Sequence, residues 1–300
     1  MQKGPVTPKG FRDIEPSLAK KRRETINTIA DVLESFGFVP LETPTLEFGQ
    51  TLTGKYGEEE KLIYKFTDRG GRELALRYDL TVPLARFIAN NLGLIANGPF
   101  SRYQIGQVFR GENTQRGRWR EFTQFDFDTI GSDSLEEDAR VIAAGVAATR
   151  KVGLASAQFA INDRKNFKDL SIEDIRAIDK IYKVGKDKTE KRLVDFVENS
   201  KPTENLHELF RILESKYSLK EGVDFFFDPA LARGLDYYTS TILELKPSGK
   251  PEEQSIGGGG RYDKLIGNMF LPAQAGAGRE IPAVGFSFGV DRLTDLLPNA

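Results

Sequence analysis

The sequence predicts an α+β fold, in which helices flank an antiparallel sheet and a helical insertion interrupts the chain. Strand-like stretches at residues 101–109 and 121–130 follow one another across a polar, arginine-rich loop, as antiparallel neighbours do. Residues 63–66 and 73–77 flank the turn-forming sequence DRGGR, which is a second hairpin pattern. Segments with apolar residues at helical spacing lie between these strand candidates, so the helices are expected to pack on the sheet.

The amino-terminal elements alternate between helical and extended chain. A helix is predicted over residues 17–36, where apolar residues recur at helical spacing and Gly37 follows as a C-cap. Residues 38–47 are predicted to be extended, because each proline disfavours helical backbone in the residue before it. A second helix is predicted after Asp79, whose carboxylate suits an N-cap.

The strand at residues 121–130 has one strongly polar face. Alternation places Gln124, Asp126 and Asp128 on the same side of the strand as Phe122. Aligned polar groups on a central strand are costly if they are buried without partners. Exposure to solvent is one interpretation, and a polar ligand cavity is the other; the flanking aromatic residues favour the cavity.

The second half of the chain changes character at about residue 165. A capping-box pattern at Ser134 and Glu137 predicts a helix that ends near Val152. Residues 165–221 are charged and helical with few strand signals, whereas strand-like stretches return after residue 222. The predicted organisation is therefore a core of two parts, residues 1–164 and 222–300, with a helical insertion at residues 165–221.

The composition restricts the chemistry. The chain has no cysteine and one histidine, which removes disulfides, thiolate zinc sites and cysteine nucleophiles. Catalysis must then use carboxylates, arginines, tyrosines and backbone amides, and any metal would be an oxygen-liganded ion such as Mg²⁺. The sequence has no apolar run long enough to span a membrane, and its amino terminus lacks a secretory pattern, so a cytoplasmic protein is expected.

Arginines at separated positions are the strongest functional signal. Arg110, Arg233 and Arg292 each lie beside strand-like or glycine-rich sequence rather than in a solvated charge run. A guanidinium group offers parallel donors to a phosphate or carboxylate and stays charged, so their convergence would create a polyphosphate site. The glycine run in SIGGGGRYDKL does not match a phosphate-binding loop, and it is either a mobile turn or a flat wall beside a ligand.

Seven segments, spanning about Gly10 to Leu297, together resemble histidyl-tRNA synthetases, a family of class II aminoacyl-tRNA synthetases. In chain order they are PKGFRDIEP, FGFVPLETPTLE, LRYDLTVPLARF, FRGENTQRGRWREFTQFDFDTIG, RGLDYYTSTI, GGGGRYDKLI and PAVGFSFGVDRL. The resemblance implies a sheet of six or seven antiparallel strands and a homodimer formed through the segment around Pro44. The implied reaction joins histidine to ATP, which gives histidyl-adenylate and pyrophosphate, and then transfers the histidyl group to the 3′ end of tRNA(His).

The same resemblance implies residue roles on the ATP side of the site. Arg110 would hold the α-phosphate, and Arg233 would contact both the substrate carboxylate and the charge that develops on that phosphate. Arg118 would bind the terminal phosphates, and Glu112 would meet the adenine side. Arg292 would cover the adenine and the γ-phosphate, opposite Phe122.

On the histidine side, the implied contacts come from three segments. Asp79 and Thr81, with Leu80 between them, would bind the α-ammonium group. Gln124 would lie beside the carboxylate and amino groups. The imidazole would be held by Asp128 and Tyr238, with Tyr237 as a weaker assignment. An imidazole carries one donor and one acceptor nitrogen, so a carboxylate and a phenol are complementary partners.

Two departures from the family pattern affect the expected function. Family members continue past the GVDRL segment into an anticodon-binding domain, whereas this chain stops at Ala300, so full affinity for tRNA is in doubt. The alternative reading is a synthetase-like regulatory subunit of ATP phosphoribosyltransferase, which shares the fold and lacks the anticodon-binding domain. Such subunits typically lose the catalytic arginines and the RGLDYY pattern, so the presence of Arg110, Arg233 and Arg292 favours the enzyme. The resemblance also implies Mg²⁺ with the ATP, without indicating which carboxylates bind it.

Overall fold

The computed structural model describes residues 6–114, 117–232, 237–270 and 278–297. Within these ranges, one large sheet has the strand order β1-β5-β6-β11-β10-β9-β7-β8 and a small sheet has the order β2-β4-β3. Neighbours from β5 to β7 in the large sheet pair antiparallel, whereas β1 and β8 pair parallel at its two edges. The strands are β1 (Val39–Pro40), β2 (Leu46–Phe48), β3 (Lys65–Thr67), β4 (Glu73–Leu76), β5 (Phe100–Phe109), β6 (Glu121–Ile130), β7 (Gln158–Asp163), β8 (Phe225–Phe227), β9 (Thr241–Lys246), β10 (Gly257–Arg261) and β11 (Ala283–Gly289).

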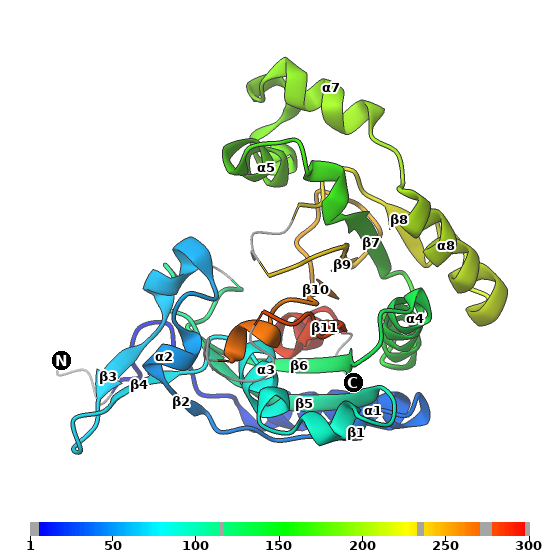
Figure 1. Ribbon diagram of the computed structural model, residues 1–300. Helices are drawn as coiled ribbons and strands as arrows, with labels where there is room; N and C mark the ends of the chain where they lie inside the picture. Colours follow the sequence, from blue (N-terminus) through cyan, green and yellow to red (C-terminus); the bar gives the residue numbers. More distant parts are fainter. Residues whose placement is uncertain (1–5, 115–116, 233–236, 271–277, 298–300) are drawn as a thin grey trace.

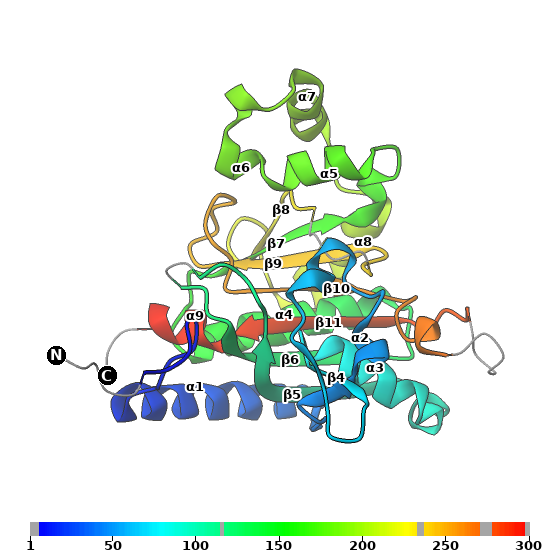
Figure 2. The same cartoon turned by 90° about the vertical axis from the view of Figure 1, so that its left-hand side faces the viewer.

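Helices cover the large sheet and extend beyond one end of it. In Figure 1, α4 and α8 lie on one side of the large sheet, and the small sheet with α2 lies on the other. Figure 2 shows α5, α6 and α7 beyond the end formed by β7 and β8. The α-helices are α1 (Pro16–Ser35), α2 (Gly49–Leu52), α3 (Thr81–Ala89), α4 (Leu135–Lys151), α5 (Ile172–Asp179), α6 (Ile181–Val184), α7 (Lys191–Asn199), α8 (Glu204–Tyr217) and α9 (Val290–Leu296).

The two faces of β6 point to different surroundings. Phe125 and Phe127 are fully buried and belong to the main apolar cluster, which includes residues of α1, α4 and α8. Because side chains alternate along a strand, Gln124, Asp126 and Asp128 point to the opposite face of the sheet. All three are less than a tenth exposed, which rules out solvent exposure as the reason for their polarity.

Several elements begin and end as their sequences predict. The helix α1 follows the predicted range of residues 17–36, and β5 and β6 are the predicted hairpin. Asp79 lies one residue before Leu80, which is the N-cap of α3, and its Oδ1 accepts a hydrogen bond from the backbone N–H of Val82 at 3.0 Å. Ser134 caps α4 through the N–H of Glu136 at 3.2 Å. The Glu137 carboxylate does not close a capping box, because it accepts hydrogen bonds from Arg140 instead.

In the described residues, six neighbouring strands of the large sheet, from β5 to β7 in its order, are antiparallel as expected, but the sheet is wider than expected. It has eight strands in the described residues, because the short parallel strands β1 and β8 extend its two edges. The glycine run is also part of the sheet: residues 257–261 form β10 between β9 and β11. The interpretation of this run as a mobile turn is therefore wrong.

Helices dominate residues 165–221, but they pack in two ways. Residues of α5, α6 and α7 form an apolar cluster with residues 230–232 and with Ala160 of β7 and Ile242 of β9, whereas α8 packs into the main cluster against α4. The division of the chain at residues 164 and 221 into core and insertion stays a prediction.

Candidate active site

A narrow cavity of about 40 Å³ lies on the face of the large sheet that carries the polar side chains of β6. Its lining comes from the start of α3, from β6, β10 and β11, and from residues that follow β5 and precede β9. Residues predicted from the sequence account for a large part of this lining: Asp79, Thr81, Arg110, Gln124, Asp128, Tyr237 and Tyr238. The cavity therefore brings together positions that are far apart in the chain.

The carboxylate of Asp128 lies between two buried partners. Arg102 of β5, directly opposite Asp128 in the strand register, forms an ion pair with it at 2.8 Å between Nη2 and Oδ2. The hydroxyl of Tyr262 donates a hydrogen bond to Asp128 Oδ1 at 2.5 Å. Burial raises the pKa of Asp128, whereas Arg102 and Tyr262 oppose this shift by stabilising the carboxylate.

The backbone next to Asp128 leaves no room for a side chain. Gly285 of β11 pairs with Asp128, and a Cβ atom at this position would lie 1.8 Å from Asp128 Oδ1. Glycine is thus required here because the carboxylate occupies the space above the neighbouring strand.

A chain of hydrogen bonds fixes the side-chain amide of Gln124. Its Nε2 donates to the hydroxyl of Ser287 at 2.8 Å, and that hydroxyl donates to the carboxylate of Asp126. Because the amide nitrogen is engaged, Oε1 is the free end of the amide. This oxygen is buried and has no hydrogen-bond partner among the described residues.

Asp79 is the second cavity residue with a buried oxygen that no described residue hydrogen-bonds. Its Oδ1 accepts hydrogen bonds from the Tyr56 hydroxyl and the Val82 N–H, each at 3.0 Å. Its Oδ2 is buried without a hydrogen-bond partner in the described part of the chain. Burial raises the pKa of Asp79, and the two hydrogen bonds and Arg110 counteract that shift. Leu80, which was predicted with Asp79 and Thr81, is fully buried and is not part of the cavity lining.

Arg110 is held between aromatic rings at the edge of the cavity. Its Cζ lies 4.3 Å from the centre of the Tyr78 ring and 5.1 Å from the centre of the Phe122 ring. Its Nε donates to the carbonyl of Tyr78 at 3.2 Å. These contacts restrain the side chain through stacking and one hydrogen bond, so part of the guanidinium edge stays available to an anion.

The two other predicted cations within the described residues, Arg118 and Arg292, are not part of the cavity lining. Arg118 forms an ion pair with Glu112 at 3.2 Å. Arg292, in the first turn of α9, donates to the carbonyl of Ser255 at 3.0 Å. Burial lowers the pKa of Arg292, and the positive charges of Arg118 and Arg110 lower it further. The positive charges of Arg118 and Arg110 thus act on Arg292, and a bound anion would relieve this repulsion.

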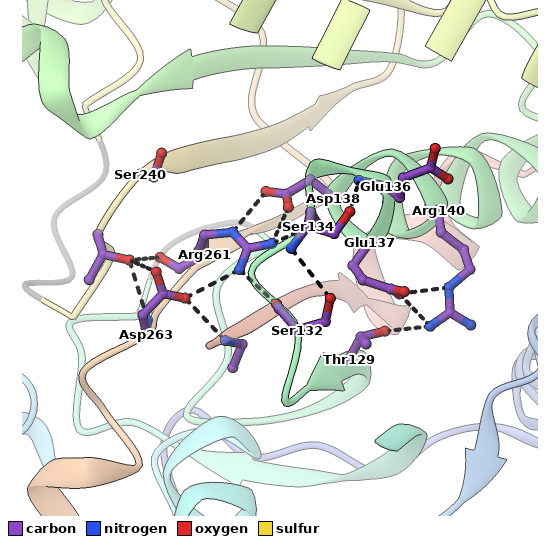
Figure 3. A network of polar contacts seen from close by, with 12 residues as sticks. Thr129, Ser132, Ser134, Glu136, Glu137, Asp138, Arg140, Ser240, Arg261 and Asp263 are labelled. Atoms are coloured by element: carbon purple, nitrogen blue, oxygen red, sulfur yellow. Dashed lines mark hydrogen bonds and ion pairs between the residues drawn. The ribbon is translucent and has the colours of Figure 1, made fainter. Parts of the chain in front are cut away.

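A buried network fixes the backbone that follows Tyr238 (Figure 3). Arg261, at the end of β10, forms an ion pair with Asp138 of α4 and donates to the carbonyl of Ser132 at 3.0 Å. The Thr239 N–H donates to the carbonyl of Arg261 at 2.8 Å, and the Thr239 hydroxyl contacts Asp263 at 3.2 Å. These contacts hold the segment that places Tyr237 and Tyr238 in the cavity wall.

The structure leaves one predicted residue open and adds others. Arg233 lies outside the described residues, so its convergence with Arg110 and Arg292 stays a prediction. Sequence reasoning did not identify three side chains that form or support the site, Arg102, Tyr262 and Ser287, and it gave Asp126 no role of its own. Asp126 had a signal, because it shares the polar face of its strand with Gln124 and Asp128.

Comparisons with known proteins agree on one family. The family model described as histidyl-tRNA synthetase matches residues 10–177 and 161–293. The histidine–tRNA ligase of Aeropyrum pernix is 39% identical over 330 residues, which cover 97% of this chain and 74% of that protein. A crystal structure of histidyl-tRNA synthetase from Nostoc sp. PCC 7120 superposes with a TM-score of 0.80 at 28% identity, covering 98% of this chain and 75% of that one.

A third comparison bears on the fold alone. A structure from Bacillus halodurans, described as an ATP phosphoribosyltransferase regulatory subunit/histidyl-tRNA synthetase, has a TM-score of 0.78 at 24% identity and covers 98% of this chain and 83% of that chain. The fold and the arginine-flanked cavity define a class II aminoacyl-tRNA synthetase core. The chain belongs to the histidyl-tRNA synthetase family.

Among the described residues, no helix is both long and apolar enough to cross a membrane.

Proposed function

We propose that this chain is the catalytic part of a histidine–tRNA ligase. It would activate histidine with ATP to histidyl-adenylate and then transfer the histidyl group to the 3′ end of tRNA(His). One observation carries the proposal: a single cavity is lined by both Arg110 and Asp128, and the buried oxygens Asp79 Oδ2 and Gln124 Oε1, which no described residue hydrogen-bonds, belong to residues of the same lining. That arrangement matches a zwitterionic amino acid whose carboxylate faces a phosphate.

Recognition of the amino acid would use the buried acceptors. Asp79 Oδ2 and Gln124 Oε1 would accept hydrogen bonds from the α-ammonium group, with Thr81 beside them. Asp128 would accept a hydrogen bond from the N–H of the imidazole ring. The Tyr238 hydroxyl would donate a hydrogen bond to the other ring nitrogen. Buried polar groups left unpaired by an analogue are costly, so such a site rejects side chains that lack both nitrogens. Tyr237 would complete the wall without contacting the ring nitrogens, whereas Leu80 is buried outside the cavity lining.

Activation would depend on positioning and charge neutralisation rather than on a protein nucleophile. The histidine carboxylate would attack the α-phosphorus of ATP, forming the acyl-phosphate bond while the bond to pyrophosphate breaks. Arg110 would bind the α-phosphate, where negative charge increases in the transition state. Arg118 and Arg292 would bind the outer phosphates and cover the adenine opposite Phe122, with Glu112 on the adenine side. Arg233 would contact the carboxylate, as its motif implies.

Mg²⁺ would enter this site with the phosphates of ATP. No three histidine or acidic side chains in the described ranges are arranged to hold an ion alone, but Mg²⁺ commonly takes one or two carboxylates plus phosphate oxygens. The ion would neutralise charge on the leaving pyrophosphate.

The homodimer that the family resemblance implies is supported by exposed apolar side chains on the small sheet. Leu46 and Phe48 of β2, close in sequence to Pro44, are 43% and 51% exposed, and Phe66 of β3 in the same small sheet is 43% exposed. Large apolar side chains on a small sheet favour burial against a second copy, and sedimentation velocity would reveal the homodimer. A cytoplasmic location stays part of the proposal.

Pyrophosphate exchange distinguishes the ligase from the regulatory-subunit alternative. The purified chain should exchange labelled pyrophosphate into ATP only when histidine and Mg²⁺ are present, and Arg110→Met should lower the exchange rate by about 100-fold or more. Arg211→Met is the matched control, because Arg211 is 72% exposed on α8. Binding of histidine without any exchange by the wild-type chain would support the regulatory subunit and overturn the proposal.

A further inference from the structure

The amino-terminal segment Lys9–Arg12 packs against the arginine loop, defined as residues 111–114 and 117–120. The N–H of Arg120 donates to the carbonyl of Gly10 at 2.8 Å, and its guanidinium contacts the carbonyl of Lys9 at 3.4 Å. Gly10 has a φ of +90°, and a Cβ at this position would lie 2.7 Å from Arg120 and 2.9 Å from Thr114. The segment therefore approaches the loop more closely than any other residue type would permit at position 10.

Arg12 connects the arginine loop to α9. Its guanidinium carbon lies 4.5 Å from the centre of the Trp119 ring, and its Nη2 lies 2.5 Å from Asp291 Oδ1. The side chain of Arg12 is 21% exposed and that of Asp291 is 10% exposed. A partly desolvated cation that stacks on a ring and pairs with a carboxylate is held more firmly than a surface ion pair.

Asp291 is itself a junction of three segments. Arg22 of α1 contacts the same oxygen, Oδ1, at 2.5 Å, and also donates to the Thr123 hydroxyl at 2.7 Å. The other oxygen, Oδ2, accepts from the N–H of Thr123 at 2.8 Å. Asp291, the residue immediately before Arg292, thus connects α9 to α1 and to the start of β6.

The groups held by these contacts belong to the ATP side of the candidate site. Glu112 and Arg118 lie on the arginine loop, and Arg292 contacts the carbonyl of Gly117 at 3.5 Å. Arg292 thus contacts the residue next to Arg118, and the like charges of Arg118 and Arg292 repel each other before a phosphate binds. Restraints from outside the site are needed to keep them facing one ligand.

We propose that the segment Lys9–Arg12 is a brace that positions the arginine loop and Arg292 for the nucleotide. Gly10 and Arg12 are then positioning residues, since they contact the loop and α9 rather than ATP. The proposal rests on the proposed ATP site and goes beyond it, because neither residue is needed for binding histidine. Loss of the brace should weaken ATP binding selectively.

The test compares Arg12→Met, Arg12→Lys and Gly10→Ala with Arg23→Met, a control at an exposed arginine of α1. Titration calorimetry gives separate dissociation constants for ATP with Mg²⁺ and for histidine, and thermal unfolding reports stability. Arg12→Met should raise the dissociation constant for ATP about tenfold, equivalent to about 1.4 kcal/mol, and leave histidine binding unchanged. Arg12→Lys should recover part of this loss, because lysine keeps the charge but not the planar stacking.

Trp119 supplies an independent readout, because it is the one tryptophan in the sequence. Its fluorescence emission should shift in Arg12→Met without ATP and stay unchanged in Arg23→Met. Unchanged ATP binding in both Arg12→Met and Gly10→Ala would overturn the brace, and so would an equal weakening of ATP and histidine binding with a lower melting temperature. If the wild-type chain binds ATP but exchanges no pyrophosphate, the proposed function is wrong. The ATP dissociation constants of the wild type and the variants still test whether the brace positions the nucleotide site.

Discussion

The hydroxyl of Tyr262, one residue after β10, donates a hydrogen bond of 2.5 Å to the carboxylate of Asp128 on β6. Strand β11 separates β6 from β10 in the sheet, so this bond reaches across a strand whose Gly285 has no side chain to block it. Burial raises the pKa of Tyr262 well above its usual value, which keeps the phenol protonated as a donor. One oxygen of Asp128 is thereby fixed, which orients the carboxylate toward the cavity.

Tyr262→Phe should therefore weaken histidine binding while ATP binding is retained. A hydrogen bond to a charged group contributes about 1.5–3 kcal/mol, so the Michaelis constant for histidine should rise about 10- to 100-fold. Pyrophosphate exchange at varied histidine and at varied ATP measures the two constants separately. Tyr182→Phe is the matched control, because Tyr182 donates to Asp228 at 2.7 Å and neither residue lines the cavity. Equal effects of the two variants on the histidine constant would count against this role.

Gly285→Ala tests whether Asp128 needs the space that this glycine leaves free on β11. The added methyl group would lie 1.8 Å from Asp128 Oδ1, so either the carboxylate or β11 must move. Displacement of a substrate-positioning group by about 1 Å can cost about 100-fold in rate, and a loss of that order is expected in pyrophosphate exchange. Gly93→Ala, at a glycine with nothing within 4 Å of the new atom, should keep wild-type activity. Wild-type exchange by Gly285→Ala would show that Asp128 does not need its observed position.

Sequence patterns predicted the local features of this fold better than its long-range contacts. Apolar spacing, prolines and the polar face of residues 121–130 indicated α1, the β5–β6 hairpin and a cavity beside Asp128. The pairing of β6 with β11 and of β7 with β9 depends on contacts between distant segments, which no local pattern encodes. The strand character of the glycine run was hidden for the same reason.

The missed site residues show where single-sequence reasoning stops. Arg102 follows Ser101 in a strand whose pattern gives no reason to single it out, and only the register places it opposite Asp128. Tyr262 follows Arg261 in the glycine motif, but its target lies two strands away in the sheet. Side chains that act by orienting another residue leave no signature in their own neighbourhood.

The buried pair of Arg102 and Asp128 should be strongly coupled in a double-mutant cycle. Removing either partner leaves the other charge buried and uncompensated, so Arg102→Met and Asp128→Asn should each lower the free energy of unfolding by about 3–5 kcal/mol. The double variant should lose less than the sum, because no lone charge remains. Urea unfolding measures all three. As a control, the exposed pair of Arg176 and Glu58, with side chains 46% and 69% exposed, should show a coupling energy below about 1 kcal/mol. Additive losses in the Arg102 and Asp128 variants would mean that their ion pair contributes nothing to stability.

Asp126 makes the stability of the folded protein depend on pH in a defined direction. Burial raises the pKa of Asp126 to about 7, the neighbouring Arg102 lowers it, and the negative charges of Asp128 and Asp79 raise it. An unfolded chain has an aspartate pKa near about 3.9, so the folded protein binds this proton more tightly. The resulting stabilisation is fully present below about pH 4 and is lost as the pH rises toward about 7.

Asp126→Asn should flatten this dependence. Wild-type protein should lose free energy of unfolding between about pH 4 and about pH 7, with a slope of up to about 1.4 kcal/mol per pH unit from this one group. The buried Asp79, Asp128 and Asp138, whose pKa values burial also raises, add slopes of the same sign. For that reason the difference between wild type and variant, measured by urea unfolding at each pH, isolates Asp126. Asp133→Asn, at an exposed position, should leave the profile unchanged, and parallel profiles for wild type and Asp126→Asn would show that Asp126 titrates at the same pH in the folded and unfolded chains.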